Sequence, residues 1–280
     1  MIGGSLGLAL QAAGFHGQII ALARDPSDVE AAVETGAVHS GVTRVDDLPA
    51  DTQLYCLCTP LCAMTGVLRQ LAPRLGDQSV VVTDVGSVKS PVVDAAGSIM
   101  PHPCNFVGGH PMTGLRQRGV SFARADLFHG ATVVLTPLSA TRPAAVELVR
   151  SVWERVGAHV KDMSPEGHDA TVARVSHLPH AVAALLLLLA EREGGLQVAA
   201  PGLLDVTRVA ARDAELWHDI LISNRDHMRA AIALLIEDLT HLDTWLERHE
   251  HGNIEHLLAR AAQIRSAWVA EKFQHPDWID

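Results

Sequence analysis

The sequence predicts an α/β domain with a doubly wound parallel sheet over residues 1–163, followed by an all-helical domain over residues 164–280. Short apolar runs alternate with segments of helical periodicity in the first part, which is typical of βαβ units. In the second part helical periodicity dominates. Two adjacent glycines precede the first apolar helical segment, as glycines do in nucleotide-binding folds.

The elements of the first domain follow from its alternating pattern. Strands, with the turns that end them, are expected where apolar and β-branched residues gather, at 18–23, 52–60, 79–87, 131–137 and 158–163. Helices are expected where the apolar spacing is helical, at 5–14, 25–36, 63–75, 88–99 and 142–157. The glycine- and proline-rich segment 105–114 is expected to be a loop.

The second domain carries long apolar helical faces. Helical periodicity covers residues 170–191, 228–250 and 254–273. Helices with this much apolar surface often pair with a second subunit, so a homodimer is expected.

Composition narrows the possible partners. Apolar residues make up 48% of the chain and charged residues 19%, which indicates a globular protein. The net charge of -10 argues against nucleic-acid and anionic-membrane partners. The apolar run 181–190 has about half of the ~20 residues that span a bilayer. No signal peptide is visible and the cysteine spacing fits no zinc site, so we expect a cytoplasmic protein without a metal.

The opening "IGGSLGLAL" matches the end of a dinucleotide-binding fingerprint. Gly3 takes the place of its third glycine, and Gly4 and Ser5 open a helix whose N–H groups suit a pyrophosphate. The first two glycines, and the strand before them, would lie upstream of Met1. If the chain begins here, this Rossmann-type sheet should show a gap beside residues 18–23, and cofactor affinity should be weak.

The residue after the predicted strand at 18–23 bears on cofactor choice. An acidic residue usually holds the ribose diol of NAD at this point, and Arg24 stands there instead. An arginine favours a 2′-phosphate, so NADP is preferred over NAD. Asp25 follows at once and remains an alternative partner for the ribose, and Arg24 remains open to being an ordinary exposed arginine.

Other candidate residues follow predicted strands, whose carboxyl ends face the ligand crevice in open α/β sheets. Thr59 and Pro60 come after one strand, and Asp84 and Ser87 end another, so Thr59, Pro60 and Asp84 are assigned to the cofactor. Asp84 also fits a helix cap, and Ser87 a turn. His110, between glycines and a proline in "GGHPMTG", fits a catalytic group on a tight loop, with a plain turn histidine as the alternative.

The helical domain offers two further candidate groups. His177 and His180 share a helix face, where core packing is a stronger expectation than metal binding. Arg208 lies in an otherwise apolar helical stretch and needs an anionic partner. A clamp on a substrate carboxylate and a structural ion pair both satisfy that need.

Taken together, these motifs resemble the prephenate/arogenate dehydrogenase family of tyrosine biosynthesis. The resemblance runs from residue 1 to about residue 240 and rests on the segments "IGGSLGLAL", "TDVGSVK", "GGHPMTG", "ADLFHGATVVLTP", "HD…SHLPHAV" and "DVTRVA…ELWHDI…N". It implies a Rossmann domain with a helical dimerisation domain. It also implies oxidative decarboxylation of prephenate or arogenate with NAD or NADP.

The resemblance also assigns roles to residues at matching positions. His110 corresponds to the catalytic histidine that contacts the ring hydroxyl of the substrate, and Ser87 to the serine between nicotinamide and substrate. Arg208 corresponds to the arginine that binds a substrate carboxylate. The remaining matches line the site, at Ser176, His177, His180 and Trp217.

Three alternatives stay open or are weighed against this interpretation. β-Hydroxyacid dehydrogenases share the two-domain plan but resemble each other in using a lysine on a helix as the acid/base. No lysine stands between Pro165 and Glu271, which argues against that family. A truncated, weakly active or non-catalytic helical dimer is a second alternative. Prephenate and arogenate, which differ by a keto against an amino group, are not separated by the sequence.

Overall fold

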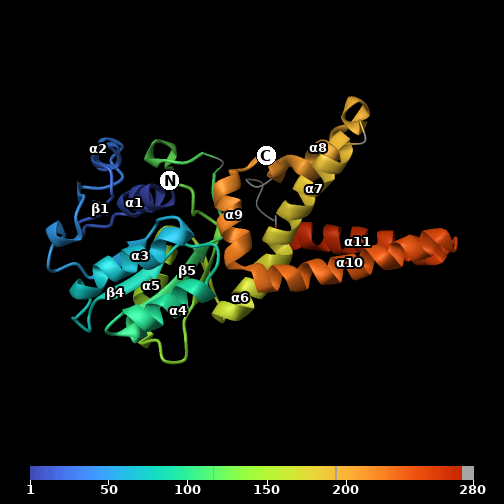
Figure 1. Cartoon of the computed structure of the whole chain (residues 1–280). Coiled ribbons are helices and arrows are strands. Elements are labelled where there is room, and N and C mark those ends of the chain that lie inside the picture. Colours follow the sequence, from blue (N-terminus) through green and yellow to red (C-terminus); the bar gives the residue numbers. More distant parts are fainter. Residues whose placement is uncertain (116, 193, 273–280) are drawn as a thin grey trace. The chain divides into compact units, whose positions relative to one another are not determined.

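The computed structural model describes residues 1–115, 117–192 and 194–272 (Figure 1). The chain separates into two compact units, Met1–Met228 and a second that begins at Arg229. The predicted domain boundary after residue 163 lies inside the first unit, where the strands end and only helices follow among the described residues. As a domain boundary it remains a prediction.

The first unit contains all seven strands of the described chain and most of its helices. The strands are β1 (Ile20–Leu22), β2 (Ser40–Val42), β3 (Leu54–Leu57), β4 (Val81–Asp84), β5 (Phe106–Pro111), β6 (Thr132–Thr136) and β7 (His159–Asp162). The helices between them are α1 (Ile2–Ala12), α2 (Pro26–Glu34), α3 (Leu61–Leu71), α4 (Ser90–Ile99) and α5 (Pro143–Arg155). Each predicted helix of this part therefore has a counterpart within a few residues.

The strands form two separate sheets. Five strands pair in the order β3-β4-β5-β6-β7, and β1 and β2 form a parallel pair of their own. The gap expected beside residues 18–23 is therefore present. All pairings of the larger sheet are parallel except that of β5 with β6. The sheet is thus mainly parallel, with one antiparallel step next to the strand that carries His110.

Helices cover both faces of the larger sheet. Val82 of β4 packs with Met64 and Leu68 of α3 and with residues of α4. Its neighbour Val81 points to the opposite face, into a core formed by α1 and α5 that includes the buried Trp153. Alternate side chains of a strand point to opposite faces, so one strand contributes to both cores.

Segment 105–114, expected to be a loop, forms the buried strand β5, so that expectation is wrong. The reason lies in the space available to its glycines. A Cβ on Gly109 would lie 2.7 Å from the backbone oxygen of Asp84, and one on Gly108 would lie 2.3 Å from Oγ1 of Thr136. Only glycines allow β5 to fit so closely between β4 and β6, and this requirement overrides their low strand propensity. Strand β2 was also not predicted.

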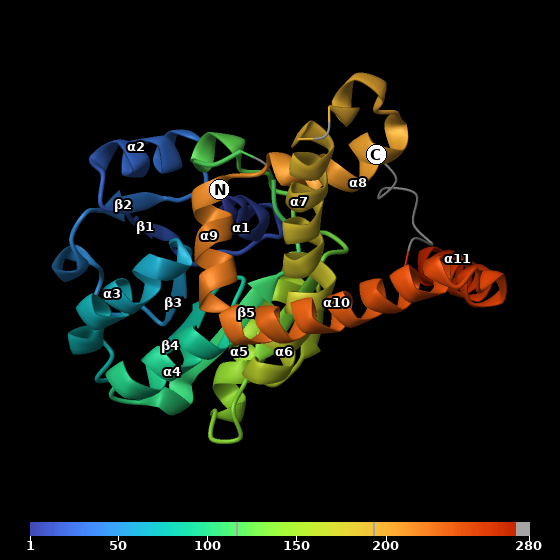
Figure 2. The same ribbon diagram turned by 45° about the vertical axis from the view of Figure 1, so that its right-hand side comes forward.

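After β7 the first unit is helical. Helix α6 (Pro165–Val172) passes through a π-helical turn (Ala173–His177) into α7 (Leu178–Arg192), and the segments form one rod in both views (Figure 2). Helices α8 (Pro201–Thr207) and α9 (Ala214–Ser223) follow, joined by the turn Arg208–Ala211. Among the described residues, Pro165–Arg192 is the one helix long and apolar enough to span a membrane by length and composition.

The second unit consists mainly of two long helices. Helix α10 (Arg225–Glu247) begins in the first unit and continues into the second, and α11 (His251–Lys272) follows a short turn. His249 in that turn has a φ of 52°, and Figure 1 shows α11 turning back along α10. Exposed apolar side chains occur along both helices, among them Leu234, Leu239 and Leu258.

Candidate active site

The centre of the candidate site is His110, on the buried strand β5. Its ring nitrogen Nδ1 lies 2.8 Å from Nε2 of His168, and the two rings meet edge to face. Burial lowers the pKa of His110 well below its usual value, and the imidazoles of His168 and His177 and the ammonium of Lys89 act in the same direction. His110 is therefore a neutral imidazole at pH 7, with a nitrogen available to accept a proton.

Asp169 lies behind these two histidines. Its Oδ1 is 2.8 Å from Nδ1 of His168 and accepts the backbone N–H of Lys89 at 2.7 Å, while Oδ2 accepts the N–H of Ser90 at 2.8 Å. Burial alone would raise the pKa of Asp169, but these hydrogen bonds outweigh it and lower the pKa. Asp169 is thus a buried carboxylate that joins α6 to the start of α4.

A buried ion pair holds the backbone next to His110. The ammonium of Lys89 is completely buried, pairs with Asp84 and donates to the carbonyl of Gly109 at 2.6 Å. The Gly109 N–H in turn donates to Oδ1 of Asp84 at 3.1 Å. Both polar groups of Gly109 are therefore fixed by one carboxylate–ammonium pair. Breaking such a pair leaves a buried charge without compensation, which is strongly destabilising.

Asp84 was predicted to bind the cofactor, and the structure places its carboxylate inside this network. In addition to Lys89 and Gly109, the carboxylate accepts the N–H of Gly86 at 2.8 Å. These contacts favour a supporting role behind the site. Ser87, the predicted catalytic serine, follows in the same loop and is partly exposed.

Three aromatic side chains form a second group in the site. The rings of His180 and Trp217 stack with centroids 3.5 Å apart, and the His177 ring meets Trp217 edge to face at 6.0 Å. The structure therefore brings these predicted residues together, from the rod and from α9. Ser176 adjoins His177 in the π-helical turn, a feature frequently found at functional sites.

Asn224 fixes the orientation of His177. Its Nδ2 donates to the carbonyl of Asp169 at 2.8 Å and lies 3.1 Å from Nδ1 of His177. Burial lowers the pKa of His177 to about 4, with a smaller contribution from the imidazole of His168. Because Nδ1 accepts from Asn224, the neutral ring of His177 carries its hydrogen on Nε2 and presents a donor.

Arg208 begins the turn that joins α8 to α9 and packs near α7. Its side chain is exposed and makes no ion pair with any residue that the structure describes. Of the two uses predicted for this arginine, the structural ion pair is therefore not observed. An unpaired guanidinium in this place is available for an external carboxylate.

The predicted nucleotide-binding residues divide into two groups. Gly3 and Gly4 lie in the first turn of α1, whose N-terminus has no side-chain cap. Arg24 is exposed after β1, and Thr59 and Pro60 lead from β3 into α3, with the buried Oγ1 of Thr59 lacking a hydrogen-bond partner. These residues are free to meet a ligand.

Ser5 and Asp25 are already engaged within the protein. The hydroxyl of Ser5 is completely buried and accepts the N–H of Arg124 at 3.0 Å. Asp25 caps α2 by accepting the N–H of Ser27 at 2.9 Å, and this bond lowers its pKa. Ser5 thus anchors a neighbouring loop, and Oδ1 of Asp25 is engaged in the cap of α2.

Sequence reasoning missed the residues that support His110. His168, Asp169, Lys89 and Asn224 had no assigned role, although the adjacent His and Asp of "HDATV" were visible. A useful signal was the rarity of lysine, since Lys89 is one of three in the chain. Asn224 closes the segment that begins with "DVTRVA", and its partner His177 lies 47 residues away in the chain.

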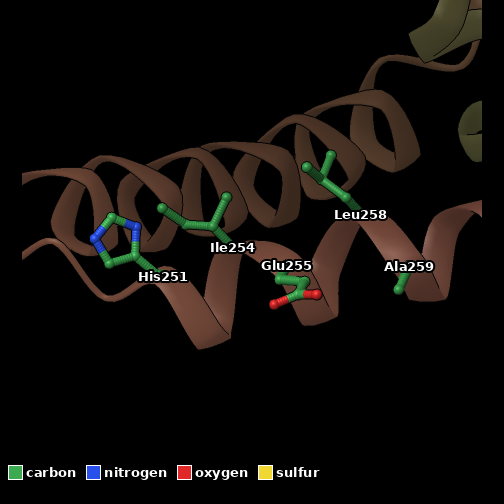
Figure 3. Close-up of a pocket in the computed structure, with 5 residues that line it drawn as sticks. All are labelled: His251, Ile254, Glu255, Leu258 and Ala259. Atoms are coloured by element: carbon green, nitrogen blue, oxygen red, sulfur yellow. The ribbon is translucent and has the colours of Figure 1, made fainter.

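A shallow groove lies elsewhere, on α11 (Figure 3). It is lined by His251, Ile254, Glu255, Leu258 and Ala259, which follow one side of that single helix. None of these residues is among the candidates for chemistry, and we assign the groove no catalytic role.

The chain matches known proteins over nearly its whole length. The nucleotide-binding domain of prephenate dehydrogenase matches residues 6–162, and the dimerization domain of the same family matches residues 164–260. The chain belongs to the prephenate dehydrogenase family. Within this family it is 31% identical over 270 residues to prephenate dehydrogenase of Bacillus subtilis, covering 95% of this chain and 73% of that protein.

Solved structures of the family agree closely. Prephenate dehydrogenase from Aquifex aeolicus, in complex with hydroxyphenyl propionate and NAD+, superposes with a TM-score of 0.88 at 32% identity, covering 95% of this chain and 94% of that one. Synechocystis arogenate dehydrogenase gives a TM-score of 0.85 at 29% identity, with 96% of each chain covered. The Rossmann-type sheet followed by a helical dimerisation domain, expected from the sequence, is thereby confirmed.

Proposed function

We propose that this member of the family oxidatively decarboxylates prephenate to 4-hydroxyphenylpyruvate, with a nicotinamide dinucleotide as hydride acceptor. The observation that carries the proposal is the buried, neutral His110, held by backbone and ring contacts close to His177 and Lys89. Such a histidine suits a substrate whose hydroxyl must give up a proton while a hydride leaves the same carbon.

The described residues fit a dinucleotide. The uncapped N-terminus of α1 offers N–H groups to a pyrophosphate, and Thr59 has a buried Oγ1 without a partner. When bound, the nicotinamide ring supplies an acceptor for the hydride from C4 of the substrate. Arg24 supports our preference for NADP over NAD, because an exposed arginine after β1 suits a 2′-phosphate.

The side chains have separate tasks in this reaction. His110 accepts the hydrogen bond, and then the proton, of the ring hydroxyl, a contribution of about 10²–10⁴-fold for a general base. Arg208 holds a carboxylate that the substrate does not lose, so it orients the ring. Ser87 is assigned a place between nicotinamide and substrate. His177 presents an N–H donor, and Trp217 with His180 provides a flat wall.

Arogenate is the second candidate substrate, favoured by the likeness to the Synechocystis arogenate dehydrogenase. The chain is also 31% identical to the cyclohexadienyl dehydrogenase of Zymomonas mobilis, over 82% of this chain and 79% of that protein. This likeness likewise leaves both substrates as candidates. The two substrates differ only in the side chain, which no assigned residue distinguishes.

A steady-state assay with both substrates and both dinucleotides tests the proposal. We expect the highest kcat/KM with prephenate and NADP. The reaction is followed by measuring the formation of both reduced nicotinamide and carbon dioxide. Higher kcat/KM with arogenate would transfer the assignment to that substrate, and preference for NAD would remove the role of Arg24. Absence of dinucleotide binding in a titration would support the non-catalytic alternative.

We further propose a cytoplasmic homodimer. Exposed leucines of α7, with Leu185 65% and Leu188 59% exposed, support an interface with a second subunit. The rod Pro165–Arg192 is apolar enough to span a membrane, but it also contains the buried site residues His168, Asp169 and His177. We therefore interpret its exposed apolar side chains as a contact surface for a second subunit.

A further inference from the structure

The hydrogen-bond chain from Asp169 to His110 relates the proton on one ring to the proton on the next. Asp169 is a carboxylate and can only accept, so Nδ1 of His168, at 2.8 Å, carries a hydrogen. With that hydrogen on Nδ1, the uncharged form of His168 has its lone pair on Nε2, and the proposal takes this form of the ring. Because Nε2 lies 2.8 Å from Nδ1 of His110, the hydrogen between the two rings belongs to His110. The lone pair of His110 is therefore left on Nε2.

We propose that His168 and Asp169 are positioning residues that hold His110 in the one neutral form able to accept a proton from the substrate. The proposal rests on the proposed function and extends it to two residues that have no assigned role. Without these hydrogen bonds, the His110 ring has two neutral forms, and the form with a hydrogen on Nε2 cannot accept a proton at that nitrogen.

Asp169 has a second task once the proton is transferred. As the hydride leaves C4, the substrate O–H bond breaks and its proton goes to Nε2 of His110, which becomes a cation. When the ring carboxylate leaves as carbon dioxide, the electron pair reaches the ring oxygen, which takes the proton back. The carboxylate of Asp169, acting through His168, balances the transient positive charge. Since the proton returns, the completely buried His168 needs no path to water.

The need for this negative charge follows from the surroundings of His110. Lys89, His168 and His177 place positive or protonatable groups around it, and Asp84 is already paired with Lys89. Asp169 is the carboxylate that is linked to His110 through the imidazole ring of His168. The arrangement resembles the serine protease triad in logic, where a buried aspartate fixes the form of a histidine.

The first test observes the protons directly and needs no substrate. Nitrogen-15 NMR of the histidine-labelled protein, with His110→Gln and His168→Gln used to assign the two rings, is expected to show hydrogen on Nδ1 of both. Hydrogen on Nε2 of His110 would overturn the proposal. Because this measurement is made without turnover, it stands even if the proposed reaction is not observed.

The second test uses kinetics of graded variants. His168→Phe removes the acceptor for His110 and is expected to lower kcat by about 10²-fold, with KM changed less than about threefold. His168→Gln offers an amide oxygen to the same hydrogen and should recover much of the loss. Asp169→Asn keeps an oxygen toward His168 but removes the charge, so kcat should fall while KM stays.

The outcomes separate positioning from a structural role. His159→Gln, at an exposed histidine of β7, is the matched control and should keep full activity. Circular dichroism and melting temperature identify any variant that is unfolded. The kinetics of the folded variants then decide between a positioning role and a structural role. If folded His168→Phe keeps kcat, or if His168→Gln is no better than His168→Phe, the proposal is overturned. Equal effects on kcat and KM would also overturn it.

Discussion

His110 and His177 are buried imidazoles that present opposite groups to the site. The first offers a lone pair, because His168 accepts its Nδ1 hydrogen, and the second offers an N–H, because Asn224 donates to its Nδ1. Burial keeps both rings neutral by lowering their pKa values. Two histidines therefore provide a base and a hydrogen-bond donor at the same pH.

Replacing His110 tests the base. We expect His110→Asn to lower kcat by about 10²–10⁴-fold while KM changes little, because proton acceptance is needed in the transition state and not for binding. Steady-state kinetics with prephenate measures both constants, with His159→Asn as the exposed control. An effect confined to KM would remove His110 from the chemical step.

Replacing Arg208 tests the carboxylate clamp. Hydrogen bonds to charged groups contribute about 1.5–3 kcal/mol, so Arg208→Ala should raise KM about 10- to 100-fold with a smaller change in kcat. Arg155→Ala, at the exposed end of α5, is the matched control. An unchanged KM would show that the substrate carboxylate is held elsewhere.

The low pKa of His177 makes stability depend on pH. Its pKa is about 4 in the folded protein and ~6.5 when unfolded, so protons bind the unfolded chain more tightly. The contribution is complete above pH 6.5 and is lost as the pH falls toward 4, by about 3 kcal/mol. Urea unfolding at pH 7.5 and 4.5 should show a smaller loss for His177→Asn than for the unaltered chain. Equal losses would contradict this assignment.

At the scale of elements, β5 is the strand on which the site depends. It lies between β4 and β6, and its glycines allow both neighbours to approach. The pair Asp84–Lys89 then fixes Gly109, the residue before His110. The position of the His110 ring is thus set by the packing of three strands.

A side chain at Gly109 should disturb this packing. Gly109→Ala would place a Cβ 2.7 Å from the carbonyl oxygen of Asp84, so the strands must shift. We expect a loss of about 1–3 kcal/mol in unfolding free energy, as for other overpacked sites, together with lower kcat. Gly114→Ala, where a Cβ meets nothing within 4 Å, is the control. Equal stability of the two variants would contradict the close approach.

At the scale of the whole molecule, the proposed dimer would account for the exposed apolar side chains of the rod. Leu185 and Leu189 lie one turn apart on α7, at 65% and 49% exposure. Burying a leucine contributes about 1.5–3 kcal/mol, so the double change Leu185→Glu with Leu189→Glu should convert dimer to monomer. Light scattering after size exclusion measures the mass. Leu138→Glu, 48% exposed in a loop, is the control, and a dimer that survives the double change would exclude this face.

The sequence by itself determined the fold class, the order of most elements and the residues His110, His177, His180 and Trp217 as one candidate group. Periodicity is local, so it is visible in the chain, and the family motifs stand at recognisable spacings. Local patterns also explain the caps and ends of α2 and α6, where Asp25 and Ser164 accept backbone N–H groups as N-cap residues do.

Only the tertiary structure decided how His110 is held. His110 and His168 are 58 residues apart in the chain, and Asp169 accepts an N–H from Lys89 over 80 residues. Segment 105–114 looked like a loop because glycine and proline are poor strand formers, yet the neighbouring strands require glycine there. Local composition does not encode such distant contacts. The buried network behind the His110 ring therefore exists only once β4, β5 and α6 have packed together.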